Sequence, residues 1–241
     1  MATRILTWNL QGRERPPLDA VAAVLDGFRP DVVALQEVQR PQALRLAHLL
    51  GWQATWRFKH WPLVVAPEGL AVLTPEPVAE LRHATLAAGP RFWSHRRRVA
   101  LAAHVATPDG PLVVVDAHLG SGVAPEERVR QARETIDLLG SAHGCIAGDL
   151  NTRPGSAVLE AYAAAGLRDA WADVHPDAPG HTNWGPGPRD HAPTKRIDFV
   201  LVTETLDVVA AEVPTAGEPG FDRYGALSDH LPVLVEVAPR R

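Results

Sequence analysis

Polar side chains able to bind a metal or carry a proton stand at the ends of several short apolar segments of this chain. Residues 144–147 have the composition of a buried strand, and Asp149 and Asn151 follow them closely. In an extended chain, residues two apart point to the same side, so these two side chains can address one ligand. An Asp-x-Asn sequence is by itself more typical of a turn than of a reaction centre. What favours chemistry is that other expected strands end or begin with similar residues, namely Asn9, Glu37, His118, Asp198, Asp229 and His230.

These residue types favour one class of reaction. Carboxylate and carboxamide oxygens without thiolates suit a hard cation such as Mg²⁺ or Mn²⁺. A zinc site would use more His or Cys ligands, and the chain has no His-Glu-x-x-His sequence. A hard cation neutralises phosphate oxygens and stabilises an oxyanion leaving group, while His118 and His230 offer proton transfer. The combination indicates attack of water on a phosphate ester.

The elements that must position these residues begin with a crossover unit. Residues 4–8 are predicted to form a strand that ends at Asn9, and residues 17–28 have the apolar spacing of a helix. Residues 31–35 are predicted to form a second buried strand, which ends near Glu37. A strand, a helix and a strand in this span predict two parallel strands in one sheet. Asn9 and Glu37 should therefore project from the same edge.

The remaining segments predict a second sheet with its own helices. Residues 52–59 alternate between apolar and polar, which predicts a half-buried strand with Trp52, Trp56 and Phe58 inward, whereas Trp61 falls outside the alternation and is expected to be exposed. Further strands are predicted at 68–73, 78–81, 96–105, 111–117, 196–202, 206–213 and 232–237, and further helices at 41–50, 125–139 and 157–165. No linker or repeat interrupts the chain. We therefore expect a single domain over residues 1–241, with two packed sheets.

Strand direction decides whether the candidate residues can meet. Asp198 and the pair Asp229-His230 precede strands, whereas the other candidates follow them. If the late strands run antiparallel to the early ones, their starting ends lie where the early strands finish, and all candidates converge at one rim. The stretch 175–193 is rich in Pro, Gly, His and Asp, and long loops in compact domains are usually functional. Residues 214–227 are expected to be irregular.

Composition limits the binding partners, the disulfides and the cellular location that we expect. The net charge of −4 and pI near 6.2 do not favour tight, sequence-independent binding to long nucleic acid, although a local basic patch would suffice for it. Cys145 is the only cysteine, so no intrachain disulfide is possible, and its apolar surroundings indicate an inert buried thiol. We find no signal-peptide pattern and no apolar run long enough to span a bilayer, and we expect a cytoplasmic protein with no membrane insertion.

The ordered set of motifs resembles the signatures of the endonuclease/exonuclease/phosphatase superfamily, over residues 4 to 237. The matching segments are Thr7-Trp8-Asn9, Leu35-Gln36-Glu37, Glu68-Gly69-Leu70-Ala71-Val72-Leu73, Ala117-His118-Leu119, Gly148-Asp149-Leu150-Asn151, Arg196-Ile197-Asp198-Phe199 and Ser228-Asp229-His230. Single motifs such as Ser-Asp-His are weak, but the full set in order is specific. The resemblance implies an α/β fold, a four-layer α/β/β/α sandwich, and a metal-dependent phosphoesterase.

The resemblance also implies residue roles. Glu37 is expected to be the principal ligand of Mg²⁺ or Mn²⁺, supported by Asn9 and Asp229. His230 is expected to be the general base or water-orienting group, held in its tautomer by Asp198.

The same resemblance implies that Asp149 positions the attacking water or a second cation. Asn151 is expected to hydrogen-bond the scissile phosphate. His118 is expected to stabilise charge on the phosphate or to serve the leaving oxygen, with Glu68 orienting it; a solvated acid is the alternative for Glu68.

The sequence gives weaker indications of which residues bind the substrate. In the long loop we expect Trp184, with Arg189 and Lys195, to contact substrate. The run Arg96-Arg97-Arg98 could meet phosphates, but it also fits a solvated strand edge, so Arg98 is a weaker candidate.

Three functions compete. The first is a nuclease or nucleotide phosphodiesterase, for which nucleic acid is a candidate partner. The second is a phosphatase or phospholipase-type phosphodiesterase acting on lipid, inositol or sugar phosphates, favoured by the acidic pI and by Ala117-His118-Leu119. The third is an inactive scaffold that binds ligand at the rim; every ligand type being intact argues against it. The sequence does not determine the oligomeric state.

Overall fold

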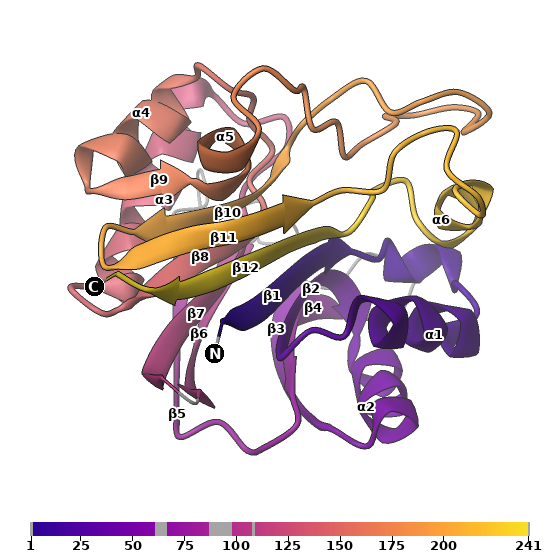
Figure 1. The fold of residues 1–241 in the computed structure, drawn as a ribbon, viewed down its shortest axis with the longest axis horizontal. Coiled ribbons are helices and arrows are strands. Elements are labelled where there is room, and N and C mark those ends of the chain that lie inside the picture. The colour runs from indigo at the N-terminus through magenta and orange to yellow at the C-terminus, as the bar shows by residue number, and fades with distance from the viewer. Residues whose placement is uncertain (1, 61–66, 87–97, 108, 241) are drawn as a thin grey trace.

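The computed structural model describes residues 2–60, 67–86, 98–107 and 109–240, and its core is a pair of six-stranded sheets packed face to face. Helices lie on the outer face of each sheet, which gives the four layers visible in Figure 1. This arrangement confirms the predicted α/β sandwich. The predicted positions Trp61, Arg96 and Arg97 lie outside the described residues.

The first sheet contains the strands nearest the two ends of the chain. Its order is β11 (Leu206–Glu212), β12 (Val233–Pro239), β1 (Thr3–Asn9), β2 (Val32–Gln39), β4 (Glu68–Thr74) and β3 (Gln53–His60). Its outer face is covered by α1 (Leu18–Phe28), α2 (Arg40–Leu50) and the short α6 (Asp222–Leu227), and a 3-10 turn, η1 (Gly12–Glu14), follows β1.

The second sheet is built from the middle of the chain. Its order is β5 (Glu80–Leu86), β6 (Arg98–Thr107), β7 (Gly110–His118), β8 (Gly144–Asp149), β10 (Asp198–Thr203) and β9 (Leu167–Asp169). α3 (Pro125–Leu139) and α4 (Ala157–Ala164) cover its outer face, and α5 (Ala170–Val174) packs near β11.

The alternation of side chains along the strands explains the layering. In β1, Ile5 faces the core between the sheets, whereas Leu6 and Trp8 face the helices. In β10, Val200 faces the inner core and Phe199 faces the helical side. Successive residues of a strand point to opposite faces of the sheet. A strand of these sheets therefore contributes side chains both to the core between the sheets and to the core under the helices. Both faces need apolar residues, which is why these segments are continuous apolar runs in the sequence.

Strand directions agree with the convergence argument. β1 runs parallel to β2, and β7 runs parallel to β8. β12 is antiparallel to β1 and β10 is antiparallel to β8, with Asp198 paired to Asp149. The starting ends of β10 and β12 therefore lie where β8 and β1 finish.

The structure corrects several predicted elements. β5 begins at Glu80 and continues to Leu86, where the sequence predicted a strand at 78–81. β9, α5 and α6 were not predicted; they have three, five and six residues, too short for a periodic pattern to be recognised. None of the helices among the described residues is long and apolar enough to cross a membrane.

Candidate active site

Asp149, at the end of β8, lies at the centre of the predicted rim. Its Oδ2 accepts a hydrogen bond from Asn9 Nδ2 at 3.1 Å, and the same oxygen lies 3.5 Å from His118 Nε2 and 3.9 Å from His230 Nε2. Its Oδ1 accepts from the backbone N–H of Asn151 at 2.9 Å. Residues from both sheets thus meet at one carboxylate.

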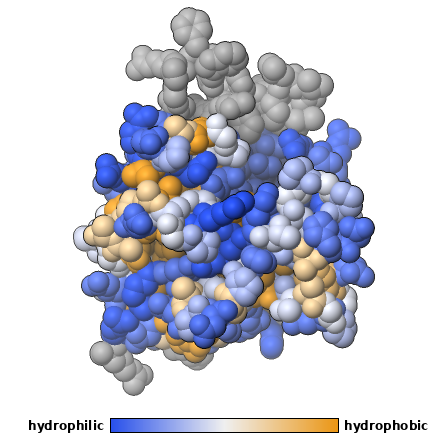
Figure 2. Space-filling model, turned by 90° about the horizontal axis from the view of Figure 1, so that it is seen from above, coloured by the Kyte–Doolittle hydropathy of each residue, from blue (hydrophilic) through white to orange (hydrophobic). Residues whose placement is uncertain are grey.

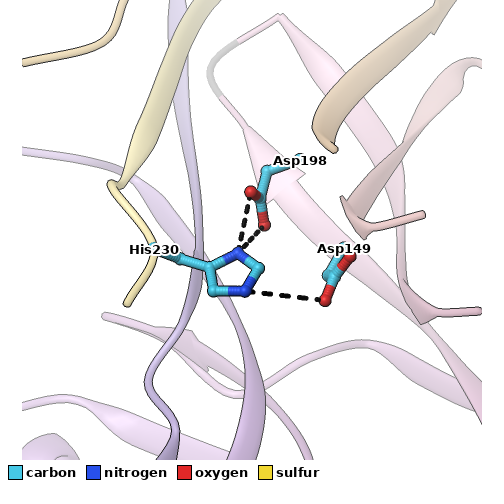
Figure 3. A group of neighbouring side chains, drawn as sticks. All are labelled: Asp149, Asp198 and His230. Atoms are coloured by element: carbon cyan, nitrogen blue, oxygen red, sulfur yellow. Dashed lines mark hydrogen bonds and ion pairs between the residues drawn. The ribbon is translucent and has the colours of Figure 1, made fainter. Parts of the chain in front are cut away.

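His230 is held by a buried carboxylate, as Figure 3 shows. Its Nδ1 lies 3.0 Å from Asp198 Oδ1 and 2.9 Å from Oδ2, and Thr182 Oγ1 donates to that Oδ2 at 2.5 Å. A carboxylate only accepts, so Nδ1 carries a proton and Nε2 faces Asp149. Burial lowers the pKa of His230, but the charges and hydrogen bonds of its acidic neighbours, Asp198 foremost, outweigh burial and raise it.

The segment Ser228–His230 is fixed to β1 by hydrogen bonds. Ser228 Oγ donates to the Asn9 carbonyl at 2.6 Å and accepts from the His230 N–H at 3.1 Å. Trp8 Nε1 donates to the His230 carbonyl at 2.8 Å. These bonds place the imidazole beside the strand that carries Asn9.

Glu37 projects into the rim from an irregularity in β2. The register with β4 shifts between Leu35 and Val38, and Glu37 has a left-handed backbone with φ of 52°. Such a conformation costs a non-glycine residue about 1–3 kcal/mol and is found mostly at functional sites. Glu37 Oε1 lies 3.9 Å from His118 Nε2 and 3.8 Å from Lys59 Nζ.

The acids of the rim share one electrostatic field. Burial and the neighbouring charge of Glu37 contribute to raised pKa values at Asp149, Asp229 and Glu68. Burial also acts to raise the pKa of Glu37 itself, but nearby cations, led by Lys59, outweigh it and hold the pKa below its usual value. Asp229 Oδ1 lies 3.9 Å from His230 Nε2.

The donors present fit a hard divalent cation. In the described part of the chain, Asp149, Asp198 and His230 bring potential ligand atoms within 4.8 Å of one another. Asp198 is already engaged with Thr182 and His230. The remaining carboxylates are like charges held close together, a repulsion that a bound cation would relieve.

Comparisons with known proteins agree with this geometry. The model of the endonuclease/exonuclease/phosphatase family matches residues 6–230, nearly the whole chain. The chain belongs to this family. A comparison with curated proteins finds no match.

Solved structures share the family fold. A family protein from Beutenbergia cavernae is 26% identical with a TM-score of 0.74, over 99% of this chain and 72% of that one. D. rerio TDP2, complexed with single-strand DNA product, and the Bacteroides thetaiotaomicron mannosyl-6-phosphatase are each 17% identical with a TM-score of 0.73, over 98% of this chain and 99% of theirs. Family members hydrolyse phosphoester bonds and depend on a divalent metal, so this chain is a phosphoesterase of the family.

In this family member, the structure brings together the candidates that the motifs predicted. The central group comprises Asn9, Glu37, His118, Asp149, Asn151, Asp198, Asp229 and His230. Glu68 is buried beside it rather than solvated. Asn151, with φ of 46°, donates its Nδ2 to the Leu119 carbonyl at 3.0 Å.

The residues that were predicted to bind substrate, Trp184, Arg98 and Arg189, use their side chains mainly for contacts within the protein. Trp184 is only 5% exposed, packs beside Phe221 and donates Nε1 to the His191 carbonyl, so its ring has little free surface to contact substrate. Arg98 is buried at 9% exposure and donates to the Leu119 carbonyl, which excludes a solvated edge for this residue. Arg189 bonds the Gly225 carbonyl and Gln11.

Lys59 is the site residue that sequence reasoning missed. Its polar neighbours in β3 suggested a solvent-facing position, but that face of the strand turns toward the second sheet, where Lys59 is 0% exposed. Its Nζ lies 3.1 Å from His118 Nδ1. The available signal was its position at the end of an alternating strand, in a chain with only one other lysine, Lys195.

A second missed feature lies under the rim, between the sheets. Gln36 Nε2 donates to Asp116 Oδ1 at 2.7 Å and to Thr7 Oγ1 at 2.9 Å. Burial raises the pKa of Asp116 well above its usual value, and within the described part of the chain neither Gln36 Oε1 nor Asp116 Oδ2 has a hydrogen-bond partner.

Proposed function

We propose that this protein hydrolyses a phosphodiester bond by in-line attack of a water activated by His230, with nucleic acid or a nucleotide as substrate. The observation that carries the proposal is the buried Asp198–His230 pair, whose imidazole turns Nε2 toward the acids of the rim. A base held in this way has a defined tautomer and a single direction in which to accept a proton.

The roles of the neighbouring residues follow from their contacts. Asp198 fixes the Nδ1–H tautomer of His230 and stabilises the imidazolium formed when Nε2 takes the proton of water. Asp149, 3.9 Å from that Nε2, orients the same water. Asn151 uses one amide hydrogen on the Leu119 carbonyl, which leaves the other for a phosphate oxygen.

Glu37, Asn9 and Asp229 would hold the divalent cation, for which we propose Mg²⁺ or Mn²⁺ because the donors are oxygens. When bound, such a cation neutralises phosphate charge and stabilises the leaving oxygen. The mutual repulsion of the acids around Glu37 supports this assignment.

The cations near the rim support an anionic substrate. Arg13 and Arg98 act electrostatically on Glu37, and Arg189 acts on Asp229, although the chain as a whole is acidic. TDP2, a protein of similar fold, is complexed with single-strand DNA product. A second candidate is a phosphatase or phospholipase-type enzyme for sugar, inositol or lipid phosphates, supported by the Ala117-His118-Leu119 sequence and by the similar fold of a mannosyl-6-phosphatase.

A substrate panel tests the proposal. Plasmid, single-stranded DNA, RNA, bis(p-nitrophenyl) phosphate and p-nitrophenyl phosphate would be compared with Mg²⁺ or Mn²⁺, with and without chelator. We expect turnover of the diesters that the chelator abolishes. Activity on the monoester alone would favour the second candidate, and no turnover of any substrate would contradict both.

A further inference from the structure

Lys59 makes a contact that the proposed chemistry does not yet use. The residue lies near the end of β3 in the first sheet, with its side chain fully buried, and Nζ is 3.1 Å from Nδ1 of His118, at the end of β7 in the second sheet. The same Nζ lies 3.8 Å from Glu37 Oε1. Lysine is almost never fully buried unless it is paired. The contacts of Lys59 with His118 and Glu37 therefore account for its burial and indicate a function at the site.

The chemistry of the two groups fixes the direction of the hydrogen bond. His118 Nε2 faces the carboxylate oxygens of Asp149 and Glu37, which accept hydrogen bonds, whereas Nδ1 faces the ammonium of Lys59. An ammonium has three donors and no acceptor. The bond therefore requires His118 Nδ1 to be the acceptor, which places the imidazole proton on Nε2.

The second ring nitrogen of His118 faces the reaction centre. Nε2 lies 3.5 Å from Asp149 Oδ2 and 3.9 Å from Glu37 Oε1, among the groups that would surround the substrate phosphate. His230 has the opposite arrangement, because Asp198 accepts from its Nδ1 and leaves Nε2 to receive a proton. A lysine on one imidazole and an aspartate on the other thus give the two Nδ1 atoms opposite roles, an acceptor in His118 and a donor in His230.

We infer that Lys59 is a positioning residue: it holds His118 as the Nε2–H tautomer, which donates a hydrogen bond to a non-bridging oxygen of the substrate phosphate. His118 then stabilises charge without carrying a proton between water and leaving group, and His230 alone acts as the base. The inference rests on the proposed phosphoesterase function for its substrate and on the Lys59–His118 contact for its geometry.

Nitrogen NMR tests the tautomer directly, on the full chain and without substrate. With histidine labelled in ¹⁵N, long-range ¹H–¹⁵N spectra near pH 7 should show His118 protonated on Nε2 and not on Nδ1, and His230 protonated on Nδ1. In Lys59→Met the His118 signals should shift toward the other tautomer, whereas Lys195→Met should leave them unchanged. Wild-type His118 protonated on Nδ1 would overturn the inference, even if Lys59→Met failed to fold. An unchanged His118 pattern in folded Lys59→Met would overturn it equally.

A double-mutant cycle tests the role in turnover. On bis(p-nitrophenyl) phosphate, Lys59→Met should lower kcat on the order of 10²-fold with little change in KM, as expected when one transition-state hydrogen-bond donor is misplaced. In a His118→Gln background the same substitution should have little further effect, because Lys59 acts through the imidazole. Full additivity of the two losses would show that Lys59 acts elsewhere. If the wild type turns over no phosphate ester, the proposed function fails, and the NMR result alone decides the tautomer.

Discussion

Replacing Asp198 with Asn tests the arrangement on which the proposed chemistry depends. Both carboxylate oxygens lie within 3.0 Å of His230 Nδ1, and Oδ2 also accepts from Thr182 Oγ1 at 2.5 Å. An amide keeps the shape but turns one acceptor into a donor. If the new donor faces Nδ1, the imidazole proton moves to Nε2, the atom that must accept a proton from water. If it faces Thr182, the hydroxyl loses its acceptor.

The size of the effect follows from the buried position of the pair. The Asp198 charge is the leading contribution that raises the pKa of His230 against burial, and the imidazolium of the transition state loses that support in the variant. In a catalytic triad the equivalent change lowers kcat about 10⁴-fold, or roughly 5.5 kcal/mol. Thr182→Val removes one hydrogen bond to a charged group, worth about 1.5–3 kcal/mol, so we expect a loss of roughly ten- to a hundredfold.

Steady-state hydrolysis of bis(p-nitrophenyl) phosphate at saturating Mg²⁺ or Mn²⁺ measures both variants, with thermal unfolding as the check on folding. Asp207→Asn is the matched control, because Asp207 is an exposed carboxylate paired with Arg240 at 2.7 Å, on β11. It should retain wild-type kcat. A folded Asp198→Asn variant with kcat within about tenfold of wild type, or a loss confined to KM, would refute the role given to His230.

Three further changes test other parts of the site. Glu37→Gln should raise the Kd for Mg²⁺ or Mn²⁺ by more than about tenfold in calorimetric titration, because it removes a ligand charge. An unchanged affinity would show that Glu37 is not a ligand of the metal. Because burial raises the pKa of Asp116, its neutral form stabilises the fold below the unfolded pKa near 3.8, and that stability is lost as pH rises toward the folded pKa. Asp116→Asn should therefore gain stability relative to wild type as pH increases, as measured by urea unfolding; a difference that does not vary with pH would contradict a neutral Asp116. Trp184→Phe removes the bond to the His191 carbonyl and should cost about 1 kcal/mol of stability with kcat and KM nearly unchanged; a raised KM without lost stability would indicate substrate contact.

Much of the candidate site could be predicted because its members stand next to strands that are recognisable from composition alone. Asn9, Glu37 and Asp149 follow apolar runs, and Asp198 and His230 precede or open them. Once β10 and β12 are antiparallel to β8 and β1, these ends must meet, as the observed register of Asp198 with Asp149 shows. The crossover rule supplied the parallel direction of the first two strands, whereas the antiparallel direction of the late strands was a condition that the structure meets.

Other features could not be predicted because they depend on how the loops and the two sheets pack against one another. Trp184 lies in a loop that looked available to substrate, but the fold packs it beside Phe221 in the core over the first sheet. Lys59 looked like the polar side of a half-buried strand, yet the second sheet covers it.

The sequence by itself determined the chemical inventory, the strand ends that carry it and the layered fold, because these depend on local composition and on period-two alternation. Only the tertiary structure decided which partner each ionisable group has. Asp198 contacts the imidazole of His230, and Lys59 contacts the imidazole of His118. Those contacts join residues that are 32 and 59 positions apart in the chain, and the packing of one sheet on the other brings Lys59 to His118. Proton positions at the site therefore follow from packing, which no local pattern of residues encodes.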